Sequence, residues 1–348
     1  MPSEELVVIR ARGVKKYFEP AAGIFRSLVG RRGQLIKAVD GVDLDIKQSE
    51  ILSLVGESGS GKTTTGEVLI LLQSPSEGSI FLKGTNLCNL KRRQLRRFRR
   101  RMQVVFQDPY QSLDPRMTVF RTIAEPIRVN ERIGKDEISS RVVNMLEQVG
   151  LSPADAFLHK YPTELSGGQR QRVAIARALI LKPDFVVADE PVSMLDVSVA
   201  SGILNLMLDL RQKYKTAFLF ITHDLAVARY ISDRIAIMYR GKIVEFGSAA
   251  DVVEKPFHPY TQLLLSAVPV ADVMTERKRV ETRADVVEKE YAAIGCRFQY
   301  RCPWVKDVCR DHVPELAEVE SEHFVACYKY PSEGETSDAA PVESTPSP

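Results

Sequence analysis

The chain has 348 residues, with 48 lysines and arginines against 45 aspartates and glutamates, and a formal net charge of +3. This length suffices for one large domain and a smaller one, and the balanced charge does not demand a nucleic-acid partner. No apolar run approaches the roughly 18 residues of a membrane-spanning helix, and residues 1–5 lack the features of a signal peptide. We therefore expect a cytoplasmic chain that would serve a membrane only through partner subunits.

The N-terminal part of the chain predicts an antiparallel β flank. Residues 6–9 and 42–46 are strand-like stretches of the alternating kind that is typical of antiparallel sheets. Between them, residues 19–36 contain several glycines among basic residues and predict an inserted loop.

A phosphate-binding loop directly follows the apolar run of residues 51–55. It consists of Gly56, Glu57, Ser58, Gly59, Ser60, Gly61, Lys62 and Thr63. A buried strand delivers the chain to a glycine-rich turn, whose N–H groups surround one phosphate, and a helix opens at Thr63. Lys62 supplies a point charge, and the Thr63 hydroxyl can ligate Mg²⁺. The motif predicts that the chain binds a nucleoside triphosphate.

Residues 91–101 are the strongest charge run, with eight lysines and arginines and no acidic residue. Such a stripe can bind nucleic acid or anionic lipid. However, Leu95, Phe98 and Met102 recur at helical spacing, which favours an amphipathic segment docked on the core with its cationic face in water. Contact with lipid headgroups is the main alternative.

Two helical patterns follow. Residues 138–149 place five apolar side chains on one face, and Gly150 ends the pattern. Farther on, the small residues of segment 165–169 precede a helix over residues 170–179, whose apolar side chains recur at helical spacing. Free N–H groups and the helix dipole attract an anion at such a start. We therefore expect a second phosphate-binding helix start there.

Two buried strands predict the remaining reactive groups. Residues 185–188 run into Asp189 and Glu190, and residues 216–221 run into Thr222 and His223. Parallel strands collect ligands at their carboxyl ends, so both sets should lie at the edge that carries the phosphate loop. There Asp189 would hold Mg²⁺, Glu190 would polarise an attacking water and His223 could reach the γ-phosphate. By itself, such a histidine would be interpreted as a helix cap.

Residues 235–246 predict a hairpin that closes the core near Gly247. The tail of residues 331–348 is rich in Pro, Ser, Thr and acidic residues without apolar periodicity, so we expect it to be disordered.

These motifs, in this order, resemble the nucleotide-binding subunit of ATP-binding cassette (ABC) transporters over about residues 5–250. The resemblance implies an α/β fold with a P-loop NTPase ABC-type core, in which a parallel sheet carries the antiparallel β flank and a helical subdomain at about residues 108–165. The expected domains are an ATPase domain at 1–248 and a small C-terminal cysteine-bearing domain at 249–330, ahead of the tail.

The resemblance also implies a composite ATP site between two ATPase domains that face each other head to tail. The phosphate loop through Thr64 would grip the phosphates, with Lys62 among the catalytic residues. Glu190 would be the catalytic base and His223 the switch residue, and Asp196 would communicate across the dimer. The segment that closes over the partner's ATP would be Ser166, Gly167, Gly168 and Gln169.

Further roles follow from the same resemblance. Mg²⁺ would be held by Thr63, Gln107 and Asp189, and Gln107 would couple it to the membrane subunits. An aromatic before the first core strand stacks on adenine in such domains; Phe18 fits by spacing, with Tyr17 close behind, although edge packing is an equal alternative. Met194 departs from the usual alanine, which should change packing rather than chemistry.

Residues 248–330 resemble the C-terminal extension of dipeptide and oligopeptide importer ATPases, and the core resembles the "F" member of their ATPase pairs. This extension contains four of the five cysteines, with Cys88 left in the core: Cys296, Cys302, Cys309 and Cys327. Four thiolates suffice for a [4Fe–4S] cluster or a closed zinc site, and the wide spacings lack the short knuckles of zinc. The resemblance favours the iron cluster. His312 and His323 are possible substitute ligands.

The function expected from this resemblance is ATP hydrolysis that powers import of dipeptides or oligopeptides. The expected partners are a paralogous ATPase forming a heterodimer, two transmembrane permeases and an extracellular solute-binding protein, with the chain peripheral on the cytoplasmic face of the membrane. The alternatives are a soluble ABC ATPase acting on nucleic acid or ribosomes, a regulatory subunit with a dead site, and an importer of oligosaccharide or nickel.

Overall fold

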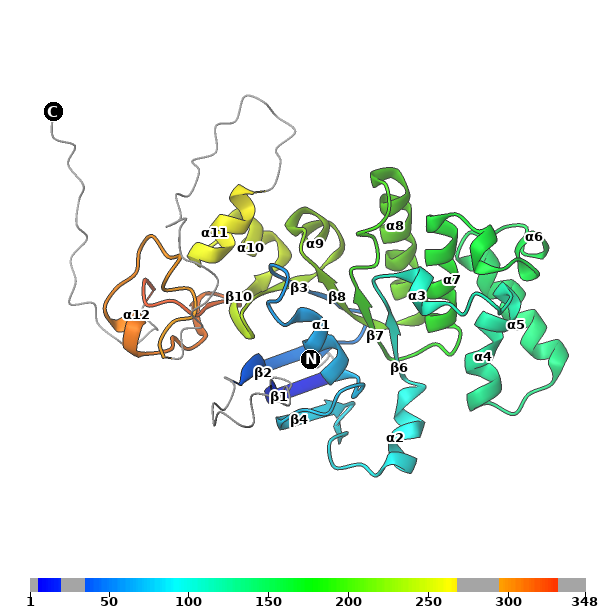
Figure 1. The fold of residues 1–348 in the computed structure, drawn as a ribbon, viewed down its shortest axis with the longest axis horizontal. Coiled ribbons are helices and arrows are strands. Elements are labelled where there is room, and N and C mark those ends of the chain that lie inside the picture. The colour runs from blue at the N-terminus through cyan, green and yellow to red at the C-terminus, as the bar shows by residue number, and fades with distance from the viewer. Residues whose placement is uncertain (1–5, 20–34, 268–293, 331–348) are drawn as a thin grey trace, which may run out of the picture. The chain divides into compact units, whose positions relative to one another are not determined.

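A computed structural model describes residues 6–19, 35–267 and 294–330, and the chain divides into two compact units, Met1–Lys242 and Ile243–Pro348 (Figure 1). The predicted disordered tail at 331–348 and most of the predicted inserted loop at 19–36 lie outside the described residues. Among the described helices, none is long and apolar enough to cross a membrane.

The first unit begins with the predicted antiparallel flank. Its four strands pair in the order β2-β1-β4-β5. Their bounds are β1 (Val7–Phe18), β2 (Ile36–Lys47), β4 (Glu77–Leu82) and β5 (Thr85–Asn86). Ile9, Ala11 and Val14 of β1 are fully buried, which gives this sheet one apolar face.

A parallel sheet forms the core of the first unit. Its neighbouring strands are β9 (Arg234–Tyr239), β3 (Ile51–Val55), β8 (Ala217–Thr222), β7 (Phe185–Asp189) and β6 (Met102–Val105), in that order. Every pair among them is parallel. All residues of β3, β7 and β8 are buried, because helices and the second sheet cover both faces. Their carboxyl ends therefore share one edge.

Three helices cover this core: α1 (Lys62–Leu69), α8 (Val197–Tyr214) and α9 (Leu225–Ile231). Helix α1 lies between the two sheets and contacts β1, β2, β7 and β8 (Figure 1). The close approach depends on Gly66, because a Cβ there would lie 2.8 Å from Val187 Cγ1 and 2.9 Å from Ile221 Cδ1.

The helical subdomain follows β6 and gathers on one side of the first unit (Figure 1). It contains α3 (Pro109–Ser112), α4 (Val119–Asn130), α5 (Lys135–Gln148), α6 (Asp155–Leu158), a 3₁₀ turn (Pro162–Glu164) and α7 (Gly167–Leu179). The predicted apolar face of α5 is buried, and Gly150 follows the helix with φ +73°, as the pattern predicted.

Helix α2 (Arg92–Arg99) carries the arginine run directly before β6. Leu95 and Phe98 are half-buried and Met102 is buried, whereas every cation of α2 is exposed. The amphipathic interpretation is therefore confirmed. Where α2 joins β6, Arg101 and Lys83 both form ion pairs with Asp184, just before β7.

The second unit holds short elements. Strand β12 (His323–Val325) pairs antiparallel with β10 (Lys242–Ser248) and with β11 (Ala317–Glu320). The helices are α10 (Ala249–Glu254), α11 (Pro259–Ser266) and α12 (Val308–Asp311).

A buried carboxylate organises this second unit. Glu245 of β10 is fully buried, and it accepts hydrogen bonds from the backbone N–H groups of Phe257, at 2.7 Å, and His258, at 2.9 Å. The ring nitrogen Nε2 of His323 lies 2.9 Å from the same carboxylate. One side chain thus links β10, the turn before α11 and β12.

We predict that Glu245→Ala destabilises the second unit by about 3–5 kcal/mol, because removal of this buried carboxylate leaves two backbone N–H groups and the His323 ring without their partner. Hydrogen exchange of β10 and β12 measures the loss. The control is Asp307→Ala, since the Asp307 side chain is 99% exposed, and it should change stability by less than about 0.5 kcal/mol. Equal exchange in the two variants would contradict the role of Glu245.

Candidate functional site

The phosphate loop is built where β3 ends, and two of its glycines are required by space. A Cβ on Gly56 would lie 2.2 Å from the carbonyl oxygen of Met238. A Cβ on Gly61 would lie 2.1 Å from the carbonyl oxygen of Ala38, and Gly61 has φ +105°. Helix α1 begins at Lys62, one residue before the predicted start. The loop therefore passes between two other segments at backbone contact.

Lys62 is buried within this loop. Its Nζ donates to the carbonyl oxygens of Gly56, at 2.7 Å, and Glu57, at 2.9 Å. Burial lowers the pKa of Lys62, although the neighbouring carboxylates of Glu190 and Asp189 oppose that shift. The buried hydroxyl of Ser60 has no hydrogen-bond partner in the described part of the chain. A phosphate fits this environment, since it would accept from both groups.

Asp189 ends β7 beside the start of α1. Its carboxylate hydrogen-bonds the Thr63 side chain, and burial raises its pKa above the ordinary value. The oxygen Oδ1 is buried and has no hydrogen-bond partner among the described residues. A hydroxyl and an unpartnered carboxylate oxygen are the donor types that Mg²⁺ prefers. The residues therefore fit the predicted metal ion.

Glu190 collects the remaining predicted catalytic groups. Gln107 Nε2 donates to Glu190 Oε2 at 3.0 Å, and His223 Nδ1 lies 3.2 Å from Glu190 Oε1. These side chains follow β6, β7 and β8, so the sheet edge brings them together as predicted. The Gln107 side chain is thus hydrogen-bonded to Glu190, whereas the Thr63 side chain is hydrogen-bonded to Asp189.

Two local features of this edge could not be anticipated. Glu190 has φ +42°, which is uncommon for a residue with a side chain and indicates a constrained backbone. The cap of α9 is Asp224, whose carboxylate accepts from the N–H groups of Ala226 and Val227. His223 is therefore free of the capping role and faces Glu190.

The second predicted phosphate-binding helix start is the N-terminus of α7. Ser166 is the N-cap: its Oγ accepts from Gln169 N at 3.3 Å, and Gln169 Oε1 accepts from Ser166 N at 3.0 Å. Gly168 packs on α8, where an added Cβ would lie 2.5 Å from Val199 Cγ1. Gly167 follows the cap directly. Among the hydrogen bonds of the described residues, none joins this segment to the phosphate loop of the same chain.

Near this helix start, apolar side chains face solvent. Met194 is 62% exposed and Val197 is 84% exposed. Asp196 between them caps α8 by accepting from Val199 N at 2.9 Å. Large apolar residues in such positions are typical of a protein interface.

Sequence reasoning missed a link between α3 and α7. The guanidinium of the buried Arg170 stacks on the Tyr110 ring, with 3.6 Å from Cζ to the ring centroid, and hydrogen-bonds its hydroxyl. Arg177 donates to the Ser112 carbonyl at 2.6 Å. Arg170, Val173 and Arg177 share a helical face, so cations at apolar spacing were the available signal.

Tyr17 and Phe18, the two aromatic residues at the end of β1, make different contacts. The hydroxyl of Tyr17 donates to the Asp40 carboxylate, whereas Phe18 is half-buried with Lys16 Nζ 5.1 Å from its ring centroid. Phe18 as the adenine-stacking residue stays a prediction.

The four C-terminal cysteines line one small cavity in the second unit, together with Phe298 and Trp304. None of these four described cysteines forms a disulfide bond, and burial raises the pKa of Cys296 to about 12, with a further contribution from the other three thiols. In the described residues, no set of three or more His, Cys, Asp or Glu side chains is arranged to hold a metal ion. His323 is bound to Glu245, and His312 is exposed.

Two different family models match the two units of the chain. Residues 39–193 match the family model described as ABC transporter, and residues 244–309 match the model for the oligopeptide/dipeptide transporter C-terminal region. The chain is 44% identical over 326 residues to the oligopeptide transport ATP-binding protein AppF of Bacillus subtilis, covering 93% of this chain and 97% of the relative. It is 43% identical to a putative peptide import ATP-binding protein of Brucella ovis, covering 93% and 98%.

Solved structures are similar to about seven tenths of this chain. The ATP-binding cassette MJ0796, in a dimeric post-hydrolysis state bound to ADP and Pi, is 29% identical with a TM-score of 0.61. That similarity covers 69% of this chain and 98% of the cassette. The cbiO1 protein of Clostridium perfringens, part of the ABC transporter complex cbiONQ, is 25% identical with the same TM-score of 0.61, covering 72% and 92%.

Proposed function

Because the chain belongs to the family of ATP-binding subunits of oligopeptide and dipeptide ABC transporters, we propose that the Glu190 cluster is its hydrolytic centre. The chain is an ATPase that powers peptide import. The observation that carries the assignment is the convergence of Gln107 and His223 on the Glu190 carboxylate, beside Lys62 and Asp189.

The geometry assigns each group a step. Glu190 accepts the proton of the attacking water, while Gln107 and His223 hold its carboxylate in place. Lys62 attracts the phosphates as they gain charge. Thr63, Gln107 and Asp189 would hold Mg²⁺, which would supply positive charge against the phosphate oxygens.

We predict that Glu190→Gln lowers ATP turnover by about 10²–10⁴-fold, because a positioned base is lost while the phosphate loop is intact. Nucleotide affinity should be retained, whereas Lys62→Ala should weaken nucleotide binding itself. Turnover and binding are measured in the reconstituted transporter with the partner ATPase's catalytic site inactivated. Steady hydrolysis by Glu190→Gln in that complex would contradict the assignment.

We further propose that the ATP site is completed by a second ATPase subunit. The start of α7 makes no hydrogen bond to its own phosphate loop among the described residues, and Met194 and Val197 present apolar surface beside the Glu190 segment. The cassette MJ0796 is described as dimeric. We propose a paralogous ATPase as the partner, with two permeases, an extracellular solute-binding protein and a peripheral position on the cytoplasmic face of the membrane.

This arrangement predicts that Ser166→Arg damages the site whose phosphate loop belongs to the partner. A large cation would crowd the α7 start where the partner's γ-phosphate binds. Photolabelling with an ATP analogue should show lost trapping on the partner subunit, whereas Lys62→Ala should lose labelling of this chain.

The matched control is Ser140→Arg, which places the same side chain on an exposed position of α5. It should leave both labels unchanged. The composite model is wrong if Ser166→Arg and Lys62→Ala silence the same subunit's site.

We also propose a metal centre at Cys296, Cys302, Cys309 and Cys327, with a [4Fe–4S] cluster favoured over zinc. Four thiols that line one cavity are a suitable donor set for either. Burial raises the pKa of Cys296 and Cys327 and so disfavours their thiolates, a penalty that a bound metal would offset. Its role would be to stabilise a small unit with a thin apolar core.

We predict that anaerobically purified protein is brown, absorbs near ~400 nm and contains about four irons per chain. Cys302→Ser should lose iron and absorbance, while Cys88→Ser should retain both, because Cys88 lies in the first unit. Stoichiometric zinc in a colourless preparation would replace iron with zinc. Absence of any metal would rule out the centre.

A further inference from the structure

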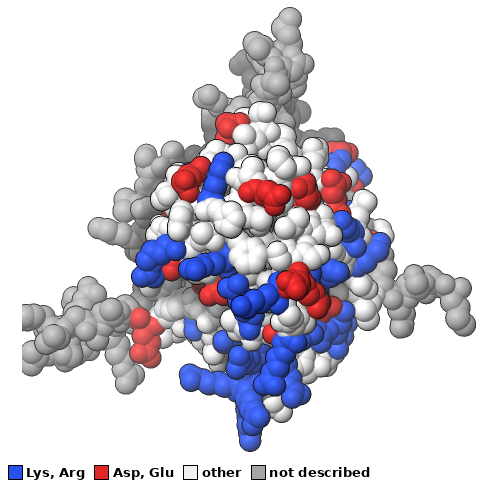
Figure 2. All heavy atoms as spheres, turned by 90° about the vertical axis from the view of Figure 1, so that its right-hand side faces the viewer, with Lys and Arg blue, Asp and Glu red and all other residues white. Residues whose placement is uncertain are grey.

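An open pocket outside the ATP site lies between α2 and the end of α4. Its volume is about 740 Å³, within the range of small-molecule sites. The lining residues are Arg93, Arg96, Arg97, Phe98, Arg100, Arg101, Val129 and Asn130. Figure 2 shows basic side chains gathered at the lower end of the face in view, over the region of α2.

Most of the positive charge of this pocket has no acidic partner among the described residues. The nearby acids are already paired, Asp184 with Lys83 and Arg101, and Glu131 with Arg141. By contrast, four of the pocket-lining cations form no ion pair among the described residues: Arg93, Arg96, Arg97 and Arg100. Arg96 donates instead to the carbonyl of Val129, which leaves Arg93, Arg97 and Arg100. These guanidinium groups are thus available to an anion from outside the chain.

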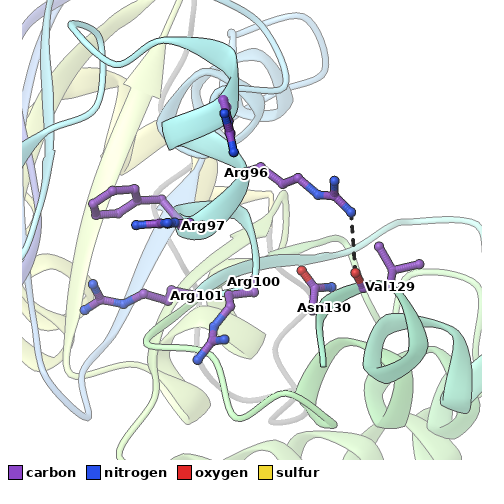
Figure 3. Close-up of a pocket in the computed structure, with 8 residues that line it drawn as sticks. Arg96, Arg97, Arg100, Arg101, Val129 and Asn130 are labelled. Carbon is purple, nitrogen blue, oxygen red and sulfur yellow. Dashed lines mark hydrogen bonds between the residues drawn. The ribbon is translucent and has the colours of Figure 1, made fainter. Parts of the chain in front are cut away.

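The walls of the pocket fix its shape. Arg96 reaches across to the carbonyl of Val129 at 3.5 Å, so the end of α4 closes one side (Figure 3). Arg101 lies 5.8 Å from the Phe98 ring and is held by Asp184. These two cations are structural, and the apolar side chains of Phe98 and Val129 line the space between them.

This pocket is separate from the nucleotide site. Strand β6 runs from Met102 to Val105, so α2 precedes its amino end, whereas Gln107 follows its carboxyl end. The phosphate loop and the Glu190 cluster lie at the carboxyl edge of the same sheet. The arginines of α2 therefore have no part in the hydrolytic step.

We propose that the α2 pocket binds an anion carrying two or more phosphate groups, held by Arg93, Arg97 and Arg100. The guanidinium fork matches phosphate oxygens bidentately, which a diffuse lysine-rich surface does not. A concave pocket and a charge run confined to residues 91–101 suit a compact ligand rather than an extended nucleic acid. A soluble polyphosphate and a diphosphate lipid headgroup share this chemistry.

The experiment measures binding of inorganic pyrophosphate by calorimetry to the full chain carrying Lys62→Ala, which removes competition from the phosphate loop. In this background, Arg93→Ala with Arg97→Ala should weaken binding by at least about tenfold, as expected for lost charge-assisted hydrogen bonds. The control is Arg92→Ala with Arg99→Ala, which removes the same charge from the same helix outside the pocket. It should change the affinity by less than about threefold.

Cosedimentation with cardiolipin vesicles distinguishes the two sources of phosphate. If the variant Arg93→Ala with Arg97→Ala, called the pocket pair, loses vesicle binding, and pyrophosphate competes with the vesicles, the ligand is a lipid headgroup. If only pyrophosphate binds, the ligand is soluble. The double variant Arg93→Lys with Arg97→Lys should retain only part of the affinity for pyrophosphate. Lysine keeps the positive charge but lacks the planar guanidinium group that binds a phosphate through two hydrogen bonds. Unchanged thermal unfolding of these exposed-site variants verifies folding.

Three outcomes would overturn the proposal. The first is the absence of saturable binding to either probe in the Lys62→Ala chain. The second is an equal loss for the pocket pair and the control pair, which indicates diffuse attraction. The third is tight binding of a single-stranded oligonucleotide that pyrophosphate does not displace.

Discussion

The structure depends on the parallel alignment of β3, β8, β7 and β6, which is imposed by burial of both faces of these strands. Parallel strands present all their carboxyl ends at one edge. The phosphate loop, the Asp189–Glu190 pair, His223 and Gln107 follow those ends, so residues separated by more than a hundred positions meet there. A shift of one strand by one residue would turn these side chains away from each other.

This edge concentrates groups that the protein interior does not satisfy. Lys62 and Asp189 are buried, Ser60 and Asp189 each retain an unpartnered oxygen in the described structure, and Glu190 has a left-handed backbone. Each feature is unfavourable for stability on its own. Together they form a site whose polar atoms a phosphate and a divalent cation would complete, which would account for the unfavourable groups occurring together.

The amino-acid sequence was informative where a position requires one particular type of residue. Gly56 and Gly61 were predictable because no side chain fits, and Asp189 and Glu190 because a buried strand ends in them. It was uninformative about partners chosen by tertiary packing. Two contacts illustrate this: the hydrogen bond from Gln107 to Glu190 and the stacking of Arg170 on Tyr110. Each joins segments whose relative position cannot be predicted from a local sequence pattern. The left-handed backbone of Glu190 is a tertiary constraint of the same kind.

The second unit shows two different solutions to burying polar groups. Glu245 is fully buried, and two backbone N–H groups and the ring of His323 lie within hydrogen-bond distance of its carboxylate. The thiols of Cys296 and Cys327 are largely buried as well, and burial raises the pKa of both, although the nearby Lys329 opposes the shift of Cys327. Removal of a buried carboxylate leaves its hydrogen-bond donors unsatisfied, whereas buried thiols become metal ligands only when they lose their protons. The unit thus combines a buried carboxylate surrounded by hydrogen-bond partners with a cluster of four thiols that line one cavity.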